Sequence, residues 1–360
     1  MSPAIPLFDV AGELALDRDQ IDTAIRRVLD SGVFVGGTEV PAFERDLAGV
    51  CGTSHAVGVG SGTDALHALY LAIGVTPGDE VVTTPFTFVA TASAASRLGA
   101  RIVFADIDSE SLTLDPRAAL VSCTDRTRAI ATVNLFGYPA PIPDQAPCPV
   151  IEDAAQSIAG RAPAGIAATL SFFPTKNLGS IGNAGAVVTN DARLAARVAL
   201  IRDQGSIERL HHTVIGGNFR MDELQAAVLH ARLRRVIANN VARRGRAERY
   251  RALLAAAKVP AELRIQRDSA EHAYHHFVIR VPHRDALRSW LGDFGIGTGV
   301  YYPVPLHLQP CFADLGYRRG SMPNAEAAAE EVLSLPIFPG LSDEAQAHTV
   351  EAISKFYASR

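Results

Sequence analysis

The chain has 360 residues, of which 48% are hydrophobic and 20% charged, and its formal net charge is −4. This composition is ordinary for a soluble globular protein, and its slightly acidic balance offers no basic surface to nucleic acid. No apolar run is long enough to cross a bilayer, and the N-terminus lacks the basic start and apolar stretch of a signal peptide. We therefore expect a cytoplasmic protein with two domains, or with one large domain and an appended lobe.

The first two thirds of the chain alternate short apolar runs with helical patterns. The predicted strands cover residues 55–60, 79–85, 101–107, 128–137, 149–156, 169–174 and 185–190. Helices are predicted at 63–74 and 87–99. Apolar runs bounded by Gly and Pro, with helices between them, indicate a mostly parallel sheet that is covered on both faces.

The pattern changes near residue 221. A long helical pattern covers 221–257, with a candidate interruption at Gly245. A smaller unit follows, with a strand at 275–281, a helix at 284–295, extended chain at 299–304 and helices at 324–335 and 342–359. We expect a large domain over 1–245 and a small C-terminal domain over 246–360.

No metal site is predicted. None of the four cysteines (Cys51, Cys123, Cys148 and Cys311) forms a Cys-x-x-Cys pair, which argues against a zinc ribbon or a redox motif. The two histidine pairs, His211–His212 and His275–His276, are adjacent rather than helically spaced. Nothing else supplies metal ligands at usable spacing.

The segment "GVGSGTDAL" (58–66) follows a predicted strand and opens a predicted helix. Its glycines allow a tight turn, and the backbone amides of Gly62 and Thr63 would point at an anion. The helix dipole adds positive potential at the same place. On its own the motif fits a plain strand-to-helix turn equally well, and a dinucleotide site would want another glycine farther into the helix.

The segment "IEDAAQS" (151–157) places Glu152 and Asp153 at the end of an apolar run. Ligands of open α/β sheets bind at the carboxyl ends of the strands. Successive side chains of a strand face opposite ways, so only one of these two carboxylates would enter a given site. Alone, the segment reads more simply as a surface loop or a helix cap.

Lys176 follows a further predicted strand, in the turn "SFFPTKNLG" (171–179). A partly desolvated lysine has a lowered pKa and a more available neutral amine, which suits Schiff-base formation with a carbonyl. An arbitrary lysine in a loop is more often turned to solvent.

Together the three features have the order expected of a pyridoxal phosphate site. The chain resembles the DegT-like sugar aminotransferases of the fold-type I pyridoxal phosphate class over nearly its whole length. The matching segments are "SGTDAL", "PFTFVATA", "VIEDAAQS", "SFFPTKNLG", "GGNFRMDELQAAVL", "YYPVPLHLQP" and "LSLPIFPGLS". The resemblance implies an α/β fold with a mostly parallel central sheet flanked by helices, a smaller C-terminal α+β domain, and pyridoxal 5′-phosphate as cofactor.

The resemblance also implies roles for individual residues. Lys176 matches the lysine that binds the cofactor covalently and moves a proton as general base and then acid. Asp153 matches the carboxylate that keeps the pyridine nitrogen protonated. The other matched cofactor contacts are Phe88 stacked on the ring, Gln156 near the ring hydroxyl, and Gly62, Thr63 and Ser171 at the phosphate. Asn218 matches an asparagine supplied by the neighbouring subunit, which implies a homodimer with shared active sites.

The implied reaction moves an amino group from an amino acid, expected to be glutamate, to a keto sugar nucleotide. The segment "KNLGSIGNAGAVVTND" resembles the subgroup that acts at C3 of the sugar more than the C4 group, although residues 182–185 read Gly-Asn-Ala-Gly where that subgroup often has Gly-Asp-Gly-Gly. His212, Tyr302 and His307 are candidate contacts for the sugar or its diphosphate. Each also fits a side chain that is simply packed in a loop.

Three alternatives stay open. A cyclitol (inosose-type) aminotransferase shares nearly all these motifs. A catalytically silent binder of sugar nucleotides, serving as a sensor, would not need the intact Lys176, Asp153 and Gln156. A dinucleotide oxidoreductase would require a nicotinamide, and the surroundings of Lys176 give it no support.

Overall fold

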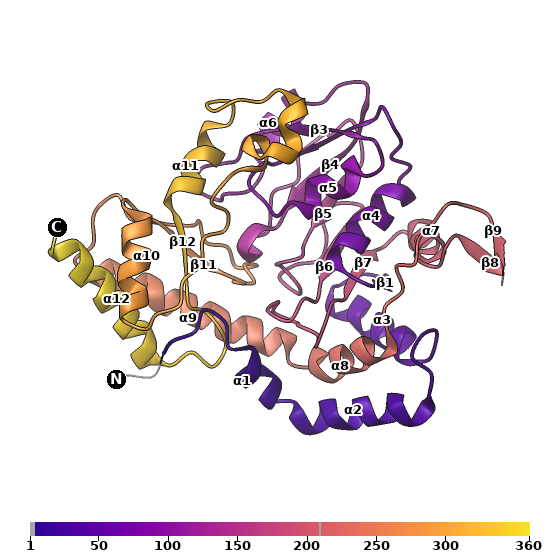
Figure 1. Cartoon of the computed structure of the whole chain (residues 1–360), viewed down its shortest axis with the longest axis horizontal. Helices are drawn as coiled ribbons and strands as arrows, with labels where there is room; N and C mark the ends of the chain where they lie inside the picture. The colour runs from indigo at the N-terminus through magenta and orange to yellow at the C-terminus, as the bar shows by residue number, and fades with distance from the viewer. Residues whose placement is uncertain (1–3, 209) are drawn as a thin grey trace.

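The structure, a computed structural model, describes residues 4–208 and 210–360 (Figure 1). Its centre is a seven-stranded sheet in the order β1-β7-β6-β5-β4-β2-β3. The strands are β1 (His55–Val59), β2 (Glu80–Thr83), β3 (Arg101–Phe104), β4 (Thr127–Val133), β5 (Val150–Asp153), β6 (Ala167–Ser171) and β7 (Gly185–Thr189). Every predicted strand of this sheet is present, and β7 alone runs antiparallel to its neighbours. The predicted mostly parallel α/β sheet is therefore confirmed.

Helices cover both faces of the sheet because its strands are apolar on both sides. Val187 of β7 belongs to a core with α4 (Gly62–Ala72), α5 (Ala90–Ser96) and α7 (Ala192–Arg202). Its neighbours Ala186 and Val188 pack on the other face with α3 (Glu39–Val50) and α8 (Glu223–Leu233). A shorter helix, α6 (Pro116–Val121), covers Val82 and Ile130. The alternation along β7 shows the two-residue period of a strand.

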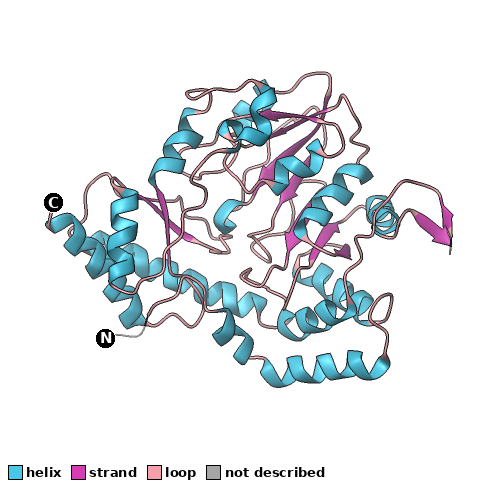
Figure 2. Cartoon of the chain, in the orientation of Figure 1, coloured by secondary structure: helices cyan, strands magenta, loops and turns pink. Residues whose placement is uncertain are grey.

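A smaller unit follows the large one (Figure 2). It contains a three-stranded antiparallel sheet in the order β10-β11-β12. Its elements are α9 (Val236–Ala256), β10 (Arg264–Ile265), β11 (Phe277–Arg280), α10 (Arg284–Asp293), the 3-10 turns η2 (Leu306–Leu308) and η3 (Pro310–Leu315), α11 (Pro323–Glu331), β12 (Val332–Leu335) and α12 (Asp343–Ala358). A separate apolar core joins α9, α10 and α12 to this sheet.

The remaining elements are two N-terminal helices, one 3-10 turn and a hairpin. Two N-terminal helices, α1 (Val10–Ala15) and α2 (Arg18–Ser31), precede α3, and a single 3-10 turn, η1 (Leu135–Gly137), follows β4. A two-stranded hairpin, β8 (Ser206–Glu208) with β9 (His211–His212), projects from the body of the molecule (Figure 1). No helix within the described ranges has the length and apolar character needed to span a membrane.

Two predictions within the C-terminal half are wrong in detail. The helical pattern breaks between α8 and α9 at residues 234–235, whereas Gly245 lies inside α9. The predicted helix at 324–335 ends at Glu331, because Val332–Leu335 pairs with β11 as strand β12. The core of the small unit begins at Ala247 of α9, so we propose residue 245 as the division between the domains.

Candidate active site

A cavity of about 570 Å³ lies at the carboxyl ends of the parallel strands. Its walls come from segments that follow β1, β2, β4, β5 and β6, together with the segments before β11 and after α10. Eight of the residues predicted from the sequence line it: Gly62, Thr63, Phe88, Asp153, Gln156, Ser171, Lys176 and Tyr302. The fold therefore brings together side chains that are spread over more than two hundred residues of sequence.

One end of the cavity is the N-terminus of α4. Ser61 caps this helix, and its hydroxyl accepts a hydrogen bond of 3.0 Å from the backbone amide of Asp64. The first amides of a helix have no partner within the helix and attract anions. A Cβ atom added to Gly62 would lie 2.8 Å from the Cβ of Ser171, and one added to Gly185 would lie 2.4 Å from the carbonyl carbon of Ser61. Glycine at both positions lets three segments close into a cup of phosphate size.

Asp153 and Lys176 share the middle of the cavity. One carboxylate oxygen of Asp153 accepts a hydrogen bond of 2.6 Å from the hydroxyl of Thr91, and the other accepts one of 3.2 Å from the amide of Ala155. Burial raises the pKa of Asp153. Lys176 opens onto the cavity but is surrounded by protein, and this desolvation lowers its pKa to about 8 despite the opposing charge of Asp153. A substantial share of the amine is therefore neutral and nucleophilic at moderately alkaline pH.

The lowered pKa of Lys176 predicts how the apoprotein captures its carbonyl partner. The neutral amine is the reactive form, so the rate of capture should rise with pH and reach half its maximum near pH 8. An ordinary lysine would require a pH near its usual 10.4. The measurement is the mass of pyridoxal phosphate fixed by borohydride after short incubations across a pH series.

The same pH series with the Asp153→Asn variant tests the direction in which Asp153 shifts the pKa of Lys176. The charge of Asp153 raises the pKa of Lys176, so its removal should move the midpoint to lower pH. A midpoint that stays near pH 10 in the wild type would show that Lys176 is fully hydrated.

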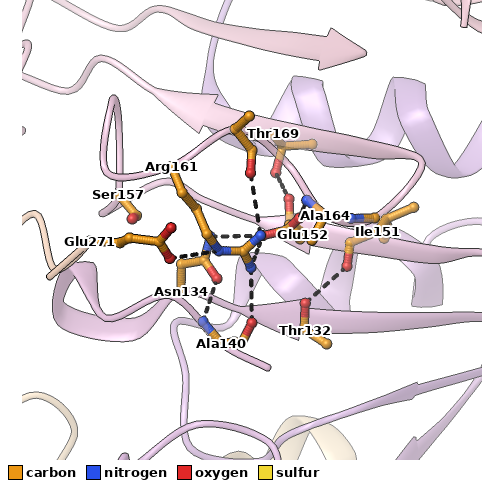
Figure 3. Close-up of polar contacts among 12 residues, drawn as sticks. Thr132, Asn134, Ala140, Ile151, Glu152, Ser157, Arg161, Ala164, Thr169 and Glu271 are labelled. Carbon is orange, nitrogen blue, oxygen red and sulfur yellow. Dashed lines mark hydrogen bonds and ion pairs between the residues drawn. The ribbon is translucent and has the colours of Figure 1, made fainter. Parts of the chain in front are cut away.

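Glu152 faces the opposite side of β5, as the strand period requires (Figure 3). Its carboxylate is 1% exposed and pairs with Arg161 at 2.8 Å. It also accepts hydrogen bonds from the amides of Ala164 and Gly165 and from the side chain of Asn134. Glu152 therefore holds the loop after β5 and orients Asn134, whereas Asp153 alone enters the cavity.

Gln156, Phe88 and Tyr302 line the cavity beside Asp153. The side-chain oxygen of Gln156 accepts a hydrogen bond of 2.5 Å from the amide of Phe136, which fixes its orientation. Phe88 precedes α5, its ring is 56% exposed, and the centre of that ring lies 6.3 Å from that of Tyr302. An exposed aromatic face at the mouth of a cavity is suited to stacking on a flat ring.

Three predicted residues lie outside the cavity of their own chain. Asn218 is exposed and forms a backbone bridge with Asp203. His212 is exposed on β9 of the projecting hairpin, with its Nδ1 atom 3.0 Å from the carbonyl of Gln204. His307 is buried, and its Nε2 atom lies 3.0 Å from a carboxylate oxygen of Glu326. The ring of His307 is thus enclosed by protein and does not line the cavity.

Sequence reasoning missed His275, His276 and Phe8 in the cavity wall. The sequence pattern around the two histidines relates only to metal binding, and no group of three or more metal-ligating side chains occurs among the described residues. The segment before β11 crosses η1, where the amide of His276 donates to the carbonyl of Phe136 at 3.2 Å. The adjacent histidines at the start of a strand were the available signal, but their neighbours in space come from η1 and the N-terminus.

A buried amine of lowered pKa, a carboxylate beside it and a phosphate cup at a helix N-terminus fit pyridoxal 5′-phosphate in both shape and charge. Together with the seven-stranded sheet and small C-terminal unit, they define a fold-type I aminotransferase that depends on this cofactor. The sequence profile of the DegT/DnrJ/EryC1/StrS aminotransferase family matches residues 16–354, and the chain belongs to that family.

Several similar proteins match the chain over nearly its full length. The "Pleiotropic regulatory protein" of Geobacillus stearothermophilus is 42% identical, covering 98% of this chain and 98% of its own. The dTDP-3-amino-3,4,6-trideoxy-alpha-D-glucose transaminase of Streptomyces venezuelae is 39% identical, covering 99% of this chain and 97% of its own. The crystal structure of S. venezuelae DesV, in complex with a ketimine intermediate, covers 100% of both chains with a TM-score of 0.95 and 39% identity.

The cofactor, when bound, supplies an electron sink for the carbanion that forms when a proton leaves the carbon bearing the amino group. Lys176 has the amine that would bind it and carry that proton. Asp153 would hold the positive charge on the ring nitrogen, and the helix N-terminus at Gly62 and Thr63 would hold the phosphate. Phe88 would cover one face of the ring.

Proposed function

We propose that this aminotransferase moves an amino group from glutamate to a keto sugar nucleotide, at C3 of the sugar. The observation that carries the proposal is the full-length similarity to relatives whose names place the amino group at C3 of a nucleotide-linked sugar. They include the S. venezuelae transaminase and a UDP-N-acetyl-3-dehydro-alpha-D-glucosamine 3-aminotransferase. Lys176, Asp153 and Gln156 stand together in the cavity, as the reaction requires.

A panel of nucleotide-linked ketosugars tests the proposal. The enzyme is first converted to its pyridoxamine phosphate form with glutamate, and the excess donor is removed. A true acceptor then restores the pyridoxal phosphate spectrum and yields a product whose mass shows one carbonyl exchanged for an amino group. Conversion of 3-keto but not 4-keto sugars supports the proposed position, whereas conversion of an inosose alone would favour a cyclitol aminotransferase.

One relative favours a second candidate, a binder of sugar nucleotides without transfer activity. The Geobacillus protein is named as a regulatory protein. The retained Lys176 and Asp153 argue for catalysis in this chain, since a sensor would need neither a reactive amine nor a carboxylate beside it. Binding of nucleotide sugars without any change in the cofactor spectrum would favour the sensor.

We further propose a homodimer in which Asn218 completes the partner's site. Asn218 is exposed and lies outside its own cavity, beside the projecting hairpin. Apolar side chains near the cavity mouth and hairpin are also exposed, among them Phe173, Ile181 and Ile215. Such side chains are typical of a surface that a second subunit covers.

Mixing two inactive variants tests the shared site. In a hybrid of Asn218→Ala with Lys176→Ala, one of the two sites has both residues intact. Random reassociation should therefore restore about a quarter of the wild-type activity. Verified hybrids that stay inactive, or a monomer in sedimentation experiments, would contradict the shared site.

A further inference from the structure

His276 is the residue of the cavity wall whose hydrogen-bonding capacity the proposed roles leave unused. Its side chain is 2% exposed and lines the cavity, and its Nδ1 atom is closed off without a hydrogen-bond partner among the described residues. A closed-off Nδ1 cannot reach a ligand, so any hydrogen bond that this side chain makes to one must come from its other ring nitrogen, Nε2.

The adjacent His275 differs in this respect. Its Nδ1 atom lies 3.2 Å from the side-chain oxygen of Asn177. The amide nitrogen of Asn177 in turn donates to Asn240 at 2.9 Å and to the carbonyl of Ala273 at 2.8 Å. His275, which also lines the cavity, is thus held by a polar network, whereas the contacts of the His276 side chain are with aromatic rings.

Besides the ring of the adjacent His275 at 4.3 Å, aromatic rings from three other parts of the chain pack around His276. Ring centres lie at 5.4 Å for Phe8, 5.7 Å for Phe136 and 4.4 Å for Tyr301. These contacts come from the N-terminal segment, from η1 and from the segment after α10, so the imidazole is oriented by three separate parts of the chain. An oriented ring can present one chosen atom to a ligand at little entropic cost.

The surroundings also decide which atom the ring presents. A proton on the closed-off Nδ1 would be a buried donor without an acceptor, so the proton belongs on Nε2. Burial and the charges of Lys176 and Arg243 lower the pKa of His276 well below the usual value, and the ring is therefore neutral. Nε2 and its proton are therefore the part of the ring that remains available to a ligand in the cavity.

We propose that His276 donates this hydrogen bond to a hydroxyl oxygen of the acceptor sugar. The inference rests on the proposed function and adds that His276 binds a hydroxyl group of the sugar. The neighbouring wall includes Tyr301 and Tyr302 together with Phe8 and His275. Lys176, committed to the cofactor, is the sole lysine or arginine among the described residues that line the cavity. A neutral donor between phenol rings matches the hydroxyl of an uncharged sugar better than it matches a carboxylate.

Measuring the two half-reactions separately distinguishes binding of the sugar hydroxyl from other roles of His276. The acceptor is the ketosugar nucleotide that the wild-type enzyme converts best. His276→Leu removes the donor, and His276→Gln restores an N–H at nearly the position of Nε2. We expect His276→Leu to raise the KM for the ketosugar about 3- to 10-fold, in line with the loss of one neutral hydrogen bond. The glutamate half-reaction should keep its KM, and His276→Gln should recover most of the loss. The dissociation constant of the amino sugar product, measured by calorimetry, should rise by the same factor.

Deoxy analogues of the ketosugar identify the oxygen. Removing the hydroxyl that His276 contacts should raise the KM for the ketosugar in the wild-type enzyme. The KM of His276→Leu should stay unchanged, because the interaction is already absent there. His272→Gln is the matched control: this histidine is also buried but stacks on Tyr274 outside the cavity, and the change should leave both KM values unaltered.

Each other outcome counts against the inference. A rise in the KM for glutamate alone would assign His276 to the donor's carboxylate. Equal losses in both half-reactions with a lowered melting temperature would assign it a structural role. Unchanged kinetics in an enzyme that does aminate the ketosugar would overturn the inference and leave the proposed function standing, whereas the absence of any ketosugar conversion by the wild type would overturn the proposed function itself.

Discussion

Lys176→Ala should abolish amino transfer, with a loss of at least about 10⁴-fold in kcat, because the same amine binds the carbonyl and carries the proton. Lys176→Arg should fail almost as badly, since a guanidinium stays protonated and offers no neutral nitrogen. The measurement is single-turnover conversion of glutamate to its 2-oxo acid. Borohydride treatment followed by peptide mass analysis should place the cofactor on residue 176 in the wild type and on no residue in either variant.

Lys355→Ala is the matched control for this result. Lys355 lies on the exposed face of α12, where it pairs with Glu351 at 2.7 Å. Its loss should leave both the kinetics and the trapped cofactor unchanged. A Lys176→Ala enzyme that still turns over within tenfold of the wild type would show that another group carries the proton.

Glu152→Leu should destabilise the fold by about 3–5 kcal/mol, because it leaves Arg161, whose side chain is only 14% exposed, without its buried carboxylate partner. The amides of Ala164 and Gly165 and the side chain of Asn134 also lose their acceptor (Figure 3). The change should appear as a lower urea midpoint for unfolding, measured without cofactor so that ligand binding does not mask it.

Glu271→Gln tests whether the effect belongs to the buried carboxylate. Glu271 is the outer partner of Arg161, at 4.0 Å and with 54% of its side chain exposed. Exposed ion pairs contribute little to stability, so this variant should unfold at nearly the wild-type urea concentration. Equal destabilisation by the two variants would mean that Arg161, rather than the set of bonds around Glu152, decides the stability of the loop.

Local pattern was enough to predict the strands of the large sheet and the residues at their ends. A buried strand has a continuous apolar run and a turn after it, as at 149–156, and both signals lie within a few residues. The direction of β7 was not predictable in this way, because parallel and antiparallel strands share the same apolar pattern when both faces are covered. Val332–Leu335 joins α11 without a break in the sequence, so only pairing with β11 makes it a strand.

In the site, too, residues marked by a local sequence pattern were predictable, whereas residues placed by contacts between distant segments were not. Asp153 ends β5 and Lys176 follows β6, and the order of the motifs placed them together. His276 could not be placed, because its neighbours Phe8, Phe136 and Tyr301 come from three distant parts of the chain. His307 lies in the segment "YYPVPLHLQP", which resembles a motif of the family. Its ring nevertheless contacts Glu326 of α11, and no local sequence pattern predicts that contact.

The cup around Gly62 has a consequence for how the protein acquires its cofactor during synthesis. Its two sides are the end of β1 and the end of β6, which are separated in the sheet by β7. A nascent chain that has emerged only to residue 184 already carries Lys176 but lacks the strand that seats β1 beside its partners. Such a chain should be unable to bind the phosphate of the cofactor. Binding of the cofactor during synthesis must therefore wait until β7 has been inserted between β1 and β6.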